Sequence, residues 1–187
     1  MNVLILTHGA GSNRNAPLLV AVANAFSAAG VEVWRYDLPF RQARPHGPPH
    51  PADAARDREG LREQVTKARA SNADRVWLGG HSYGGRQASM LAAEAPGLAD
   101  KLLLLSYPLH PPSKPQQLRT AHFEQLQTPA LFVHGSKDPF GTIEEMRIAL
   151  ETIPAAVRLL EIAGAGHDLG RKHTELAARV VEAFAAL

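Results

Sequence analysis

The feature of this sequence that most limits its fold is a regular alternation of short apolar runs with longer stretches of helical spacing. Strands buried on both faces of a sheet read as near-continuous runs of Val, Leu and Ile, because helices cover both sides of a parallel sheet. We predict six such strands, at residues 2–7, 31–36, 75–79, 101–106, 130–135 and 156–162. The intervening and final stretches predict helices at residues 16–29, 52–70, 84–94, 118–126, 142–152 and 171–186. This order predicts an α/β fold, a three-layer α/β/α sandwich with about six parallel strands and helices on both faces.

The length of 187 residues is that of one domain, and we see no internal repeat, so we expect residues 1–187 to form a single domain. No segment approaches the roughly 18 consecutive apolar residues that a membrane span requires. The start, MNVLILTHGAG, lacks the basic region and the long apolar run of a signal peptide. We therefore expect a cytoplasmic protein that does not act in a membrane.

Composition excludes several kinds of chemistry. The absence of cysteine rules out disulfides, a thiolate nucleophile and thiolate zinc sites. The 20 basic and 18 acidic residues are scattered and form no basic stripe, so we expect no nucleic-acid partner. His46 and His50 are spaced like metal ligands but have no supporting cluster, and the glycines near residue 166 miss the dinucleotide-binding spacing. We predict no metal and no cofactor.

Two stretches, residues 37–51 and 107–117, contain too many prolines for the interior of a strand or helix. We predict that both are loops. Each directly follows a predicted strand, and ligands of open α/β sheets bind beyond the carboxyl ends of the strands. These two loops should therefore border any active site.

A serine stands among glycines in the stretch LGGHSYGG, where Gly80-His81-Ser82-Tyr83-Gly84 fits the pattern G-x-S-x-G. The pattern lies between a predicted strand and a predicted helix, the context in which a sharp turn presents a serine hydroxyl. Glycines avoid side-chain clashes in such a turn, and the N-terminus of the next helix favours negative charge nearby. Ser82 is the candidate nucleophile. The alternative is a tight turn that merely contains a serine.

A serine hydroxyl is a weak nucleophile without a base, which in this context follows the serine in the chain order serine, acid, histidine. Asp138 comes just after the predicted strand 130–135, and His167 follows the predicted strand 156–162. A buried carboxylate at that place would hold the imidazole in one tautomer. The alternative for Asp138 is a purely structural turn, since Asp before Pro is common in turns. Asp168 would then be the first acid to consider.

Backbone N–H groups that stabilise an oxyanion are expected at the end of the first strand, in THGAG, and directly after Ser82. We predict Ala10 as the first donor, with Gly11 next, and Tyr83 as the second donor. Gly9 and Gly11 allow a close approach of the substrate, and we include Phe140 among the candidate substrate-binding residues.

Three further residues lie beside these motifs. His8 and His81 lie beside glycines in packed motifs, where a hydrogen-bonded structural histidine is expected. Arg86 lies in the first turn of a predicted helix, where a cation opposes the macrodipole. One interpretation pairs Arg86 with an acid such as Asp37, and the other is that Arg86 binds an anionic substrate.

Four motifs, THGAG, GGHSYGG, HGSKDPFG and GAGHDLG, occur in an order that resembles the α/β-hydrolase superfamily over practically the whole chain. The stretch YPLHPPSKPQQLRT is similar to a small capless branch of testis-expressed hydrolase-like and dienelactone-hydrolase-like proteins. The resemblance implies a Ser82–Asp138–His167 triad, acyl-transfer chemistry and the strand order 2-1-3-4-5-6. It also implies a minimal sheet, because the antiparallel strands of larger members have no counterpart before the strand that leads to THGAG.

We therefore expect a serine hydrolase, an esterase or thioesterase that forms an acyl-enzyme from a small-molecule acyl ester or thioester. The alternatives are a non-catalytic interaction module of the same fold and an acyltransferase. About two dozen residues separate the predicted strands at 101–106 and 130–135, which leaves no room for a separate cap domain. Short acyl chains are expected for that reason, and long ones would need a groove such as one lined by Leu109, Phe123 and Phe140.

Overall fold

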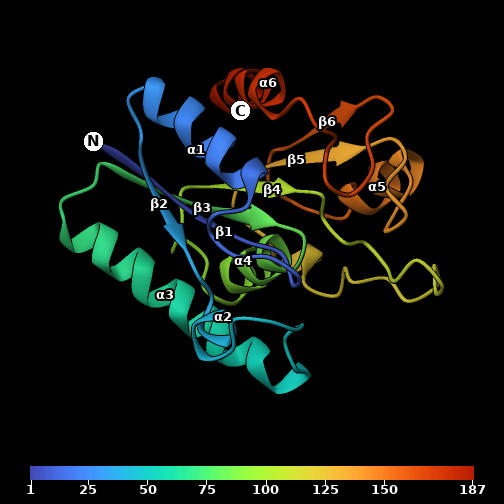
Figure 1. Ribbon diagram of the computed structural model, residues 1–187, viewed down its shortest axis with the longest axis horizontal. Coiled ribbons are helices and arrows are strands. Elements are labelled where there is room, and N and C mark those ends of the chain that lie inside the picture. Colours follow the sequence, from blue (N-terminus) through green and yellow to red (C-terminus); the bar gives the residue numbers. More distant parts are fainter.

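The computed structural model describes residues 1–187 and consists of a parallel six-stranded sheet between two layers of helices (Figure 1). The strands are β1 (Asn2–Thr7), β2 (Glu32–Tyr36), β3 (Arg75–His81), β4 (Lys101–Leu105), β5 (Ala130–Gly135) and β6 (Val157–Ile162). Their order across the sheet is β2-β1-β3-β4-β5-β6, and every neighbouring pair is parallel. The predicted fold class and strand order are confirmed.

The helices divide between the two faces of the sheet. They are α1 (Pro17–Ala28), α2 (Pro39–Ala43), α3 (Ala54–Ala70), α4 (Tyr83–Glu94), α5 (Ile143–Leu150) and α6 (His173–Ala185). Helices α1 and α6 lie side by side on one face, and α3, α4 and α5 lie on the other (Figure 1). Each strand alternates its side chains between these layers, so that Val3 and Ile5 of β1 pack toward α3 and α4, whereas Leu4 and Leu6 pack toward α1.

Two of the predicted segments are wrong. The helix expected at residues 118–126 is absent, and only a 3₁₀ turn forms at Phe123–Gln125. Phe123 is buried while Leu118 is exposed, so the segment has no continuous apolar face to hold a helix against the sheet. The predicted loop at 37–51 contains the short helix α2, which begins at a proline. Proline is tolerated there because the N–H group of the first helical residue has no partner within the helix in any case.

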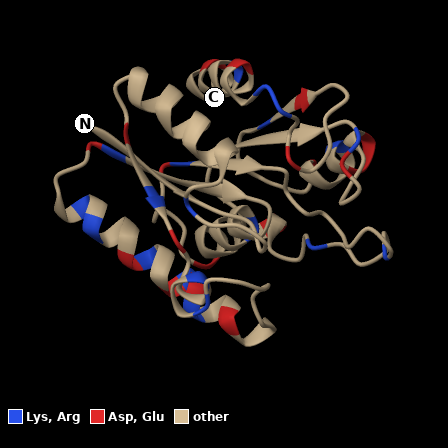
Figure 2. Ribbon diagram, viewed as in Figure 1, with Lys and Arg blue, Asp and Glu red and all other residues tan.

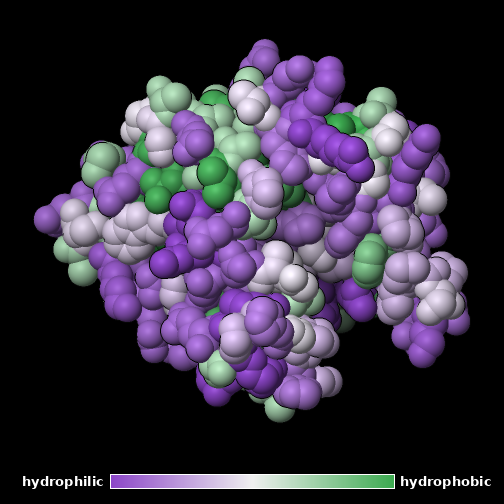
Figure 3. Space-filling view, viewed as in Figure 1, coloured by the Kyte–Doolittle hydropathy of each residue, from purple (hydrophilic) through white to green (hydrophobic).

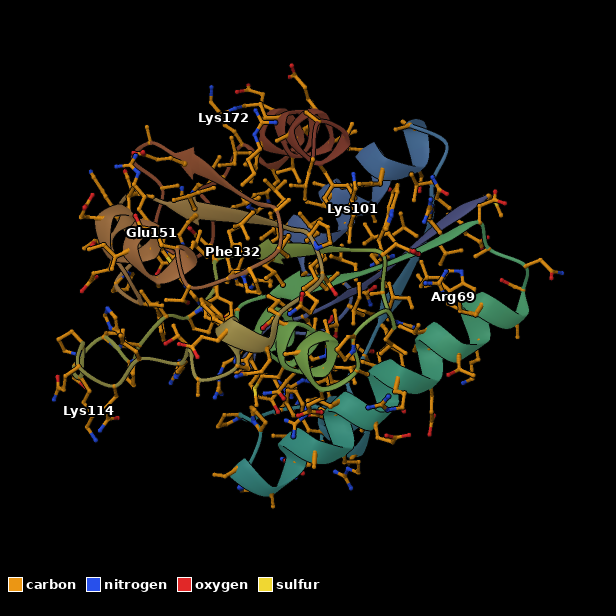
Figure 4. The ribbon with its side chains drawn as sticks, turned by 180° about the vertical axis from the view of Figure 1, so that it is seen from behind. Arg69, Lys101, Lys114, Phe132, Glu151 and Lys172 are labelled. Carbon is orange, nitrogen blue, oxygen red and sulfur yellow. The ribbon has the colours of Figure 1, made fainter.

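The other proline-rich segment is a loop, as predicted. Residues 106–129 connect β4 to β5 without an α-helix, and residues 112–118 are exposed. In Figure 4, Lys114 marks the tip of this connection, which projects away from the sheet.

Polar side chains dominate the face of the molecule that is seen in Figure 3. Figure 3 shows mostly hydrophilic residues with small apolar groups among them, and Figure 2 shows acidic and basic residues interspersed along α3. None of the helices combines the length and the apolar character needed to span a bilayer.

The start of α4 packs unusually closely against β1 and β3. A Cβ atom added at Gly84 would lie 2.4 Å from His8 O, and one at Gly80 would lie 2.8 Å from Thr7 O. A Cβ at Gly85 would lie 2.6 Å from Gly80 O. These are contacts with backbone atoms, which cannot move aside as a flexible side chain can. Glycine is therefore required at all three positions by packing rather than by a positive φ.

We expect the substitution Gly84→Ala to lower the free energy of unfolding by about 1–3 kcal/mol, because overpacking against backbone forces the helix away from the sheet. Gly11→Ala is the matched control, since a Cβ at Gly11 meets nothing within 4 Å, and its effect should stay within about 0.5 kcal/mol. Urea unfolding followed by circular dichroism measures both. Equal stability of the two variants would show that α4 is free to shift.

Candidate active site

The candidate nucleophile Ser82 lies in the sharp turn between β3 and α4, at the carboxyl end of the sheet. Its φ of 51° and ψ of −117° place it in a region that non-glycine residues rarely adopt. The Ser82 N–H group donates to Leu105 O at 2.8 Å, and Arg86 N–H donates to Ser82 O at 2.9 Å, so the turn is held on both sides. Such strain concentrates at functional sites, and here it coincides with the serine of the G-x-S-x-G pattern.

The side chains of Ser82, His167 and Asp138 form one hydrogen-bonded chain. Ser82 Oγ lies 2.8 Å from His167 Nε2, and His167 Nδ1 lies 2.8 Å from Asp138 Oδ2. A carboxylate only accepts hydrogen bonds, so in this chain Nδ1–H donates to Asp138 and Nε2 accepts from the serine hydroxyl. In that arrangement the imidazole is oriented to receive the serine proton.

Asp138 serves both roles that its sequence context suggests. One oxygen, Oδ1, accepts from Phe140 N–H at 2.9 Å and forms the expected turn, while Oδ2 faces His167. The side chain is fully buried. Asp168, the alternative acid, instead accepts from Gly170 N–H at 3.0 Å. The acid that contacts the imidazole is therefore Asp138.

The loops after β5 and β6, which carry the acid and the histidine, are joined by backbone contacts. Lys137 N–H donates to Ala165 O at 2.8 Å, and Gly164 N–H donates to Ser136 Oγ at 2.8 Å. A Cβ at Gly135 would lie 2.3 Å from Ala165 O, so only glycine permits this approach. The separation of the two side chains is thus set by the backbone rather than by the side chains alone.

Two backbone N–H groups beside Ser82 have no acceptor within the protein. These belong to Ala10 and Tyr83, the predicted oxyanion donors, and the Gly11 N–H is also unpaired. A cavity of about 300 Å³ opens at this place. Its walls are formed by Gly9, Ala10, Gly11, Ser12, His81, Ser82, Phe140 and His167. The structure therefore gathers the predicted nucleophile, base, glycines and Phe140 around one space.

Arg41 holds the loop that carries Ala10. It is 6% exposed, and its guanidinium donates to the carbonyl oxygens of Ala10 and Ser12 at 2.8 Å each, Gly47 at 2.9 Å and Arg44 at 3.0 Å. No carboxylate pairs with it. No motif in the sequence marks Arg41, and the only signal would have been an arginine inside an otherwise apolar helical turn, PFRQA.

His8 fixes the preceding peptide group. Its Nδ1–H donates to Gly9 O at 2.9 Å, and its Nε2 accepts from Leu38 N–H at 3.0 Å. Both ring nitrogens are thus used by a neutral imidazole, and burial lowers the pKa of His8. The expectation of a structural histidine is confirmed.

Two rings hold the loop and side chain of His167. His81 Nε2–H donates to His167 O at 2.8 Å, and burial lowers the pKa of His81, so its ring stays neutral. The Phe140 ring stacks on the His167 ring with centroids 4.2 Å apart. His81 is therefore also structural, whereas Phe140 contacts the candidate base and the cavity together.

A buried carboxylate that sequence reasoning missed positions the Tyr83 side chain. Asp57 on α3 accepts from Tyr83 Oη at 2.7 Å and from Phe40 N–H at 2.9 Å. Burial raises the pKa of Asp57 against the effect of these hydrogen bonds. An aspartate on the apolar side of a predicted helix was the only available signal.

Arg86 does not form the ion pair with Asp37 that one interpretation of the sequence expected. Asp37 accepts from Arg14 N–H at 2.7 Å and lies 3.6 Å from Arg14 Nε. Arg86 makes no salt bridge, and its Nε is buried without a partner. The other interpretation, an anionic ligand, stays open and is taken up below.

His122, on the connection between β4 and β5, lies near Arg86 of α4. Ser89 Oγ donates to Arg86 O at 2.9 Å, so the 2.8 Å contact between Ser89 and His122 is donated by His122 Nε2–H. Burial, followed by the charges of Arg86 and Arg58, lowers the pKa of His122 to about 4. The ring is therefore neutral at physiological pH.

This shift predicts an acid-sensitive stability. His122 has a pKa of 6.5 in the unfolded chain and of about 4 in the folded protein. The lowered pKa therefore costs no stability above pH 6.5, and the free energy of unfolding decreases as the pH falls from 6.5 to about 4. Between pH 7 and pH 5, we expect the free energy of unfolding of the variant His122→Gln to fall by about 1–2 kcal/mol less than that of the wild type. This value is reduced to allow for the partial exposure of His122 to water. Urea titrations at both pH values measure the difference. The same loss in both proteins would contradict it.

Comparison with known proteins covers nearly the whole chain. A sequence model of the family described as an alpha/beta hydrolase domain matches residues 1–183.

Solved structures of three hydrolases have the same fold. Est1E from Butyrivibrio proteoclasticus, with ferulic acid bound, gives a TM-score of 0.80 at 18% identity, with 100% of this chain and 89% of that chain covered. A dienelactone hydrolase from Anabaena variabilis gives 0.78 at 24% identity, covering 100% and 86%. XC6422 from Xanthomonas campestris, described as a serine hydrolase without a lid, gives 0.79 at 19% identity, covering 99% and 81%.

Proposed function

We propose, because this chain belongs to the alpha/beta hydrolase domain family, that it is a serine hydrolase of the esterase or thioesterase type. The observation that carries the proposal is the unbroken hydrogen-bonded chain from Ser82 Oγ through both nitrogens of His167 to the buried Asp138. The unpaired N–H groups beside the serine support it. The substrate is a small acyl ester or thioester, and the acyl group passes to water.

In the proposed reaction, Ser82 Oγ attacks the carbonyl carbon while its proton moves to His167 Nε2. The carbonyl oxygen becomes an oxyanion that accepts from the N–H groups of Ala10 and Tyr83. The bond to the leaving oxygen or sulfur then breaks, and His167 gives that atom the proton. Water attacks the acyl-enzyme with the same proton transfers, which releases the acid and restores the serine. Asp138 stabilises the imidazolium formed in each half of the reaction.

The space around Ser82 favours short acyl chains. Leu109 and Phe123, which a long groove would need, are both fully buried in the core and line no cavity at the site. Phe140 is the exception, because it lines the cavity beside Ser82. Residues 106–129 add no helix above the site. A long chain would therefore leave most of its methylene groups in water.

A fluorophosphonate probe tests the proposal directly. We expect it to label wild-type protein at Ser82 and to leave the variant Ser82→Ala unlabelled, since Ser82 combines an acceptor nitrogen of His167 at 2.8 Å with unpaired N–H groups beside it. Ser113→Ala, at an exposed serine of the β4–β5 connection, is the control and should label normally. Peptide mass spectrometry after labelling identifies the site.

Folded wild-type protein that fails to react, or labelling that survives in Ser82→Ala, would overturn the hydrolase proposal. A non-catalytic interaction module would then be the better description of the chain.

A series of p-nitrophenyl esters from acetate to palmitate tests the acyl preference. A buried methylene contributes about 0.8 kcal/mol, so a deep groove would raise kcat/KM nearly fourfold for each added carbon. We expect kcat/KM to be flat or to fall beyond roughly four to six carbons, because the cavity that contains Ser82 is small and neither Leu109 nor Phe123 extends it into a groove. A steady rise toward palmitate would show a groove that opens on substrate binding.

A further inference from the structure

A second cavity, of about 480 Å³, lies next to the one that contains Ser82, and the two share Ala10. Its walls come from the proline-rich loop after β2 and from the first turns of α4. They are formed by Ala10, Pro48, Pro49, His50, Pro51, Ala54, Tyr83, Arg86, Gln87 and Met90. Arg86 is the one charged side chain in this set if His50 is neutral, and the set includes no carboxylate.

The guanidinium of Arg86 has unused hydrogen-bonding capacity. Its Nε is buried without a partner, and the guanidinium lies close enough to the buried Tyr107 hydroxyl to oppose the rise in the pKa of Tyr107 that burial causes. The neighbouring Gln87 is fully buried, and its Nε2 also lacks an acceptor, because only its Oε1 is used, by Arg58 at 2.9 Å. Buried donors without acceptors are unfavourable, so this wall of the cavity is complementary to a ligand that supplies acceptor oxygens.

The charge of Arg86 is also uncompensated. Burial, and after it the charge of the nearby Arg86, lowers the pKa of Arg119, which has no carboxylate partner either. Arg58 is different, because Glu94 neutralises it at 2.9 Å. Neither arginine forms a salt bridge, and Arg86 lies in the first turn of α4, where the helix dipole adds further positive potential.

Nearby acids are occupied by other partners. Asp57 accepts from Tyr83 and Phe40, and Asp53 pairs with Arg44 at 2.6 Å. His122 is neutral at physiological pH. No carboxylate lines this cavity or lies within salt-bridge distance of Arg86, so a ligand is the remaining source of an anion in contact with the guanidinium.

We infer that the cavity at Arg86 binds a carboxylate carried on the acyl part of the substrate, so that the preferred esters are those of short dicarboxylic acids. The inference rests on the proposed function. The acyl side is assigned because the leaving atom must lie near His167, which lines the Ser82 cavity and not this one. An acyl group held at Ala10 and pointing away from His167 enters the cavity at Arg86. A guanidinium recognises a carboxylate through two parallel hydrogen bonds.

The test compares mono-p-nitrophenyl adipate with its neutral methyl ester, which has the same acyl chain and leaving group. In wild-type protein, kcat/KM should be at least about tenfold higher for the anionic ester. The variant Arg86→Gln should reduce this ratio by about tenfold or more, and Arg86→Lys should retain part of it. Arg62→Gln, at a partly exposed α3 arginine that pairs with Glu59 at 3.3 Å, is the matched control and should keep the ratio.

A binding measurement separates this inference from the proposed function. Calorimetric titration of the Ser82→Ala variant with the same two esters should show tighter binding of the anion, and adding Arg86→Gln should abolish the difference. If no ester is hydrolysed but this difference is present, the hydrolase proposal fails and the anion site stands. If neutral esters are hydrolysed and neither kcat/KM nor binding favours the anion, the hydrolase proposal stands and the anion site is refuted. If Arg86→Gln weakens the binding of both esters equally, Arg86 has a structural role and the inference is overturned.

Discussion

The close contact of the first turn of α4 with β1 and β3 is the constraint on which the rest of the site depends. Gly80, Gly84 and Gly85 allow backbone atoms to meet where a Cβ would come within 3 Å of its neighbours. This contact forces Ser82 into its strained conformation and places it beside the end of β1. It also determines where Tyr83 and Arg86 lie, since both belong to the same helical turn. One packing requirement thus fixes the candidate nucleophile, one oxyanion donor and the cation at the second cavity.

Sequence reasoning reached the fold and the central side chains because both depend on local patterns combined with one topological rule. β1 and β5 have the predicted bounds, since continuous apolar runs end where the sheet ends. A parallel sheet brings the carboxyl ends of its strands to one edge. Residues that directly follow β3, β5 and β6 therefore converge, and Ser82, Asp138 and His167 are such residues. Their convergence required no knowledge of long-range packing.

The parts of the site that could not be predicted depend on long-range contacts with backbone atoms. Arg41 binds carbonyl oxygens, and a carbonyl belongs to every residue, so no pattern of side chains announces such contacts. The expected pair of Arg86 with Asp37 was wrong because Asp37 is held by Arg14, a neighbour only in space. The helix expected at 118–126 failed for a related reason, since the burial of Phe123 in the core was not visible locally.

The way in which Arg41 is bound has a further consequence for the proposed chemistry. A carboxylate partner would neutralise its charge, whereas carbonyl oxygens satisfy its N–H groups and leave the charge in place. That charge lies behind the loop whose Ala10 N–H is one of the two unpaired donors, and Ala10 O accepts from Arg41 itself. Polarisation of one peptide group by a buried cation strengthens the positive potential along the loop. The same side chain therefore both fixes the loop and favours the negative charge that the proposed reaction develops in front of it.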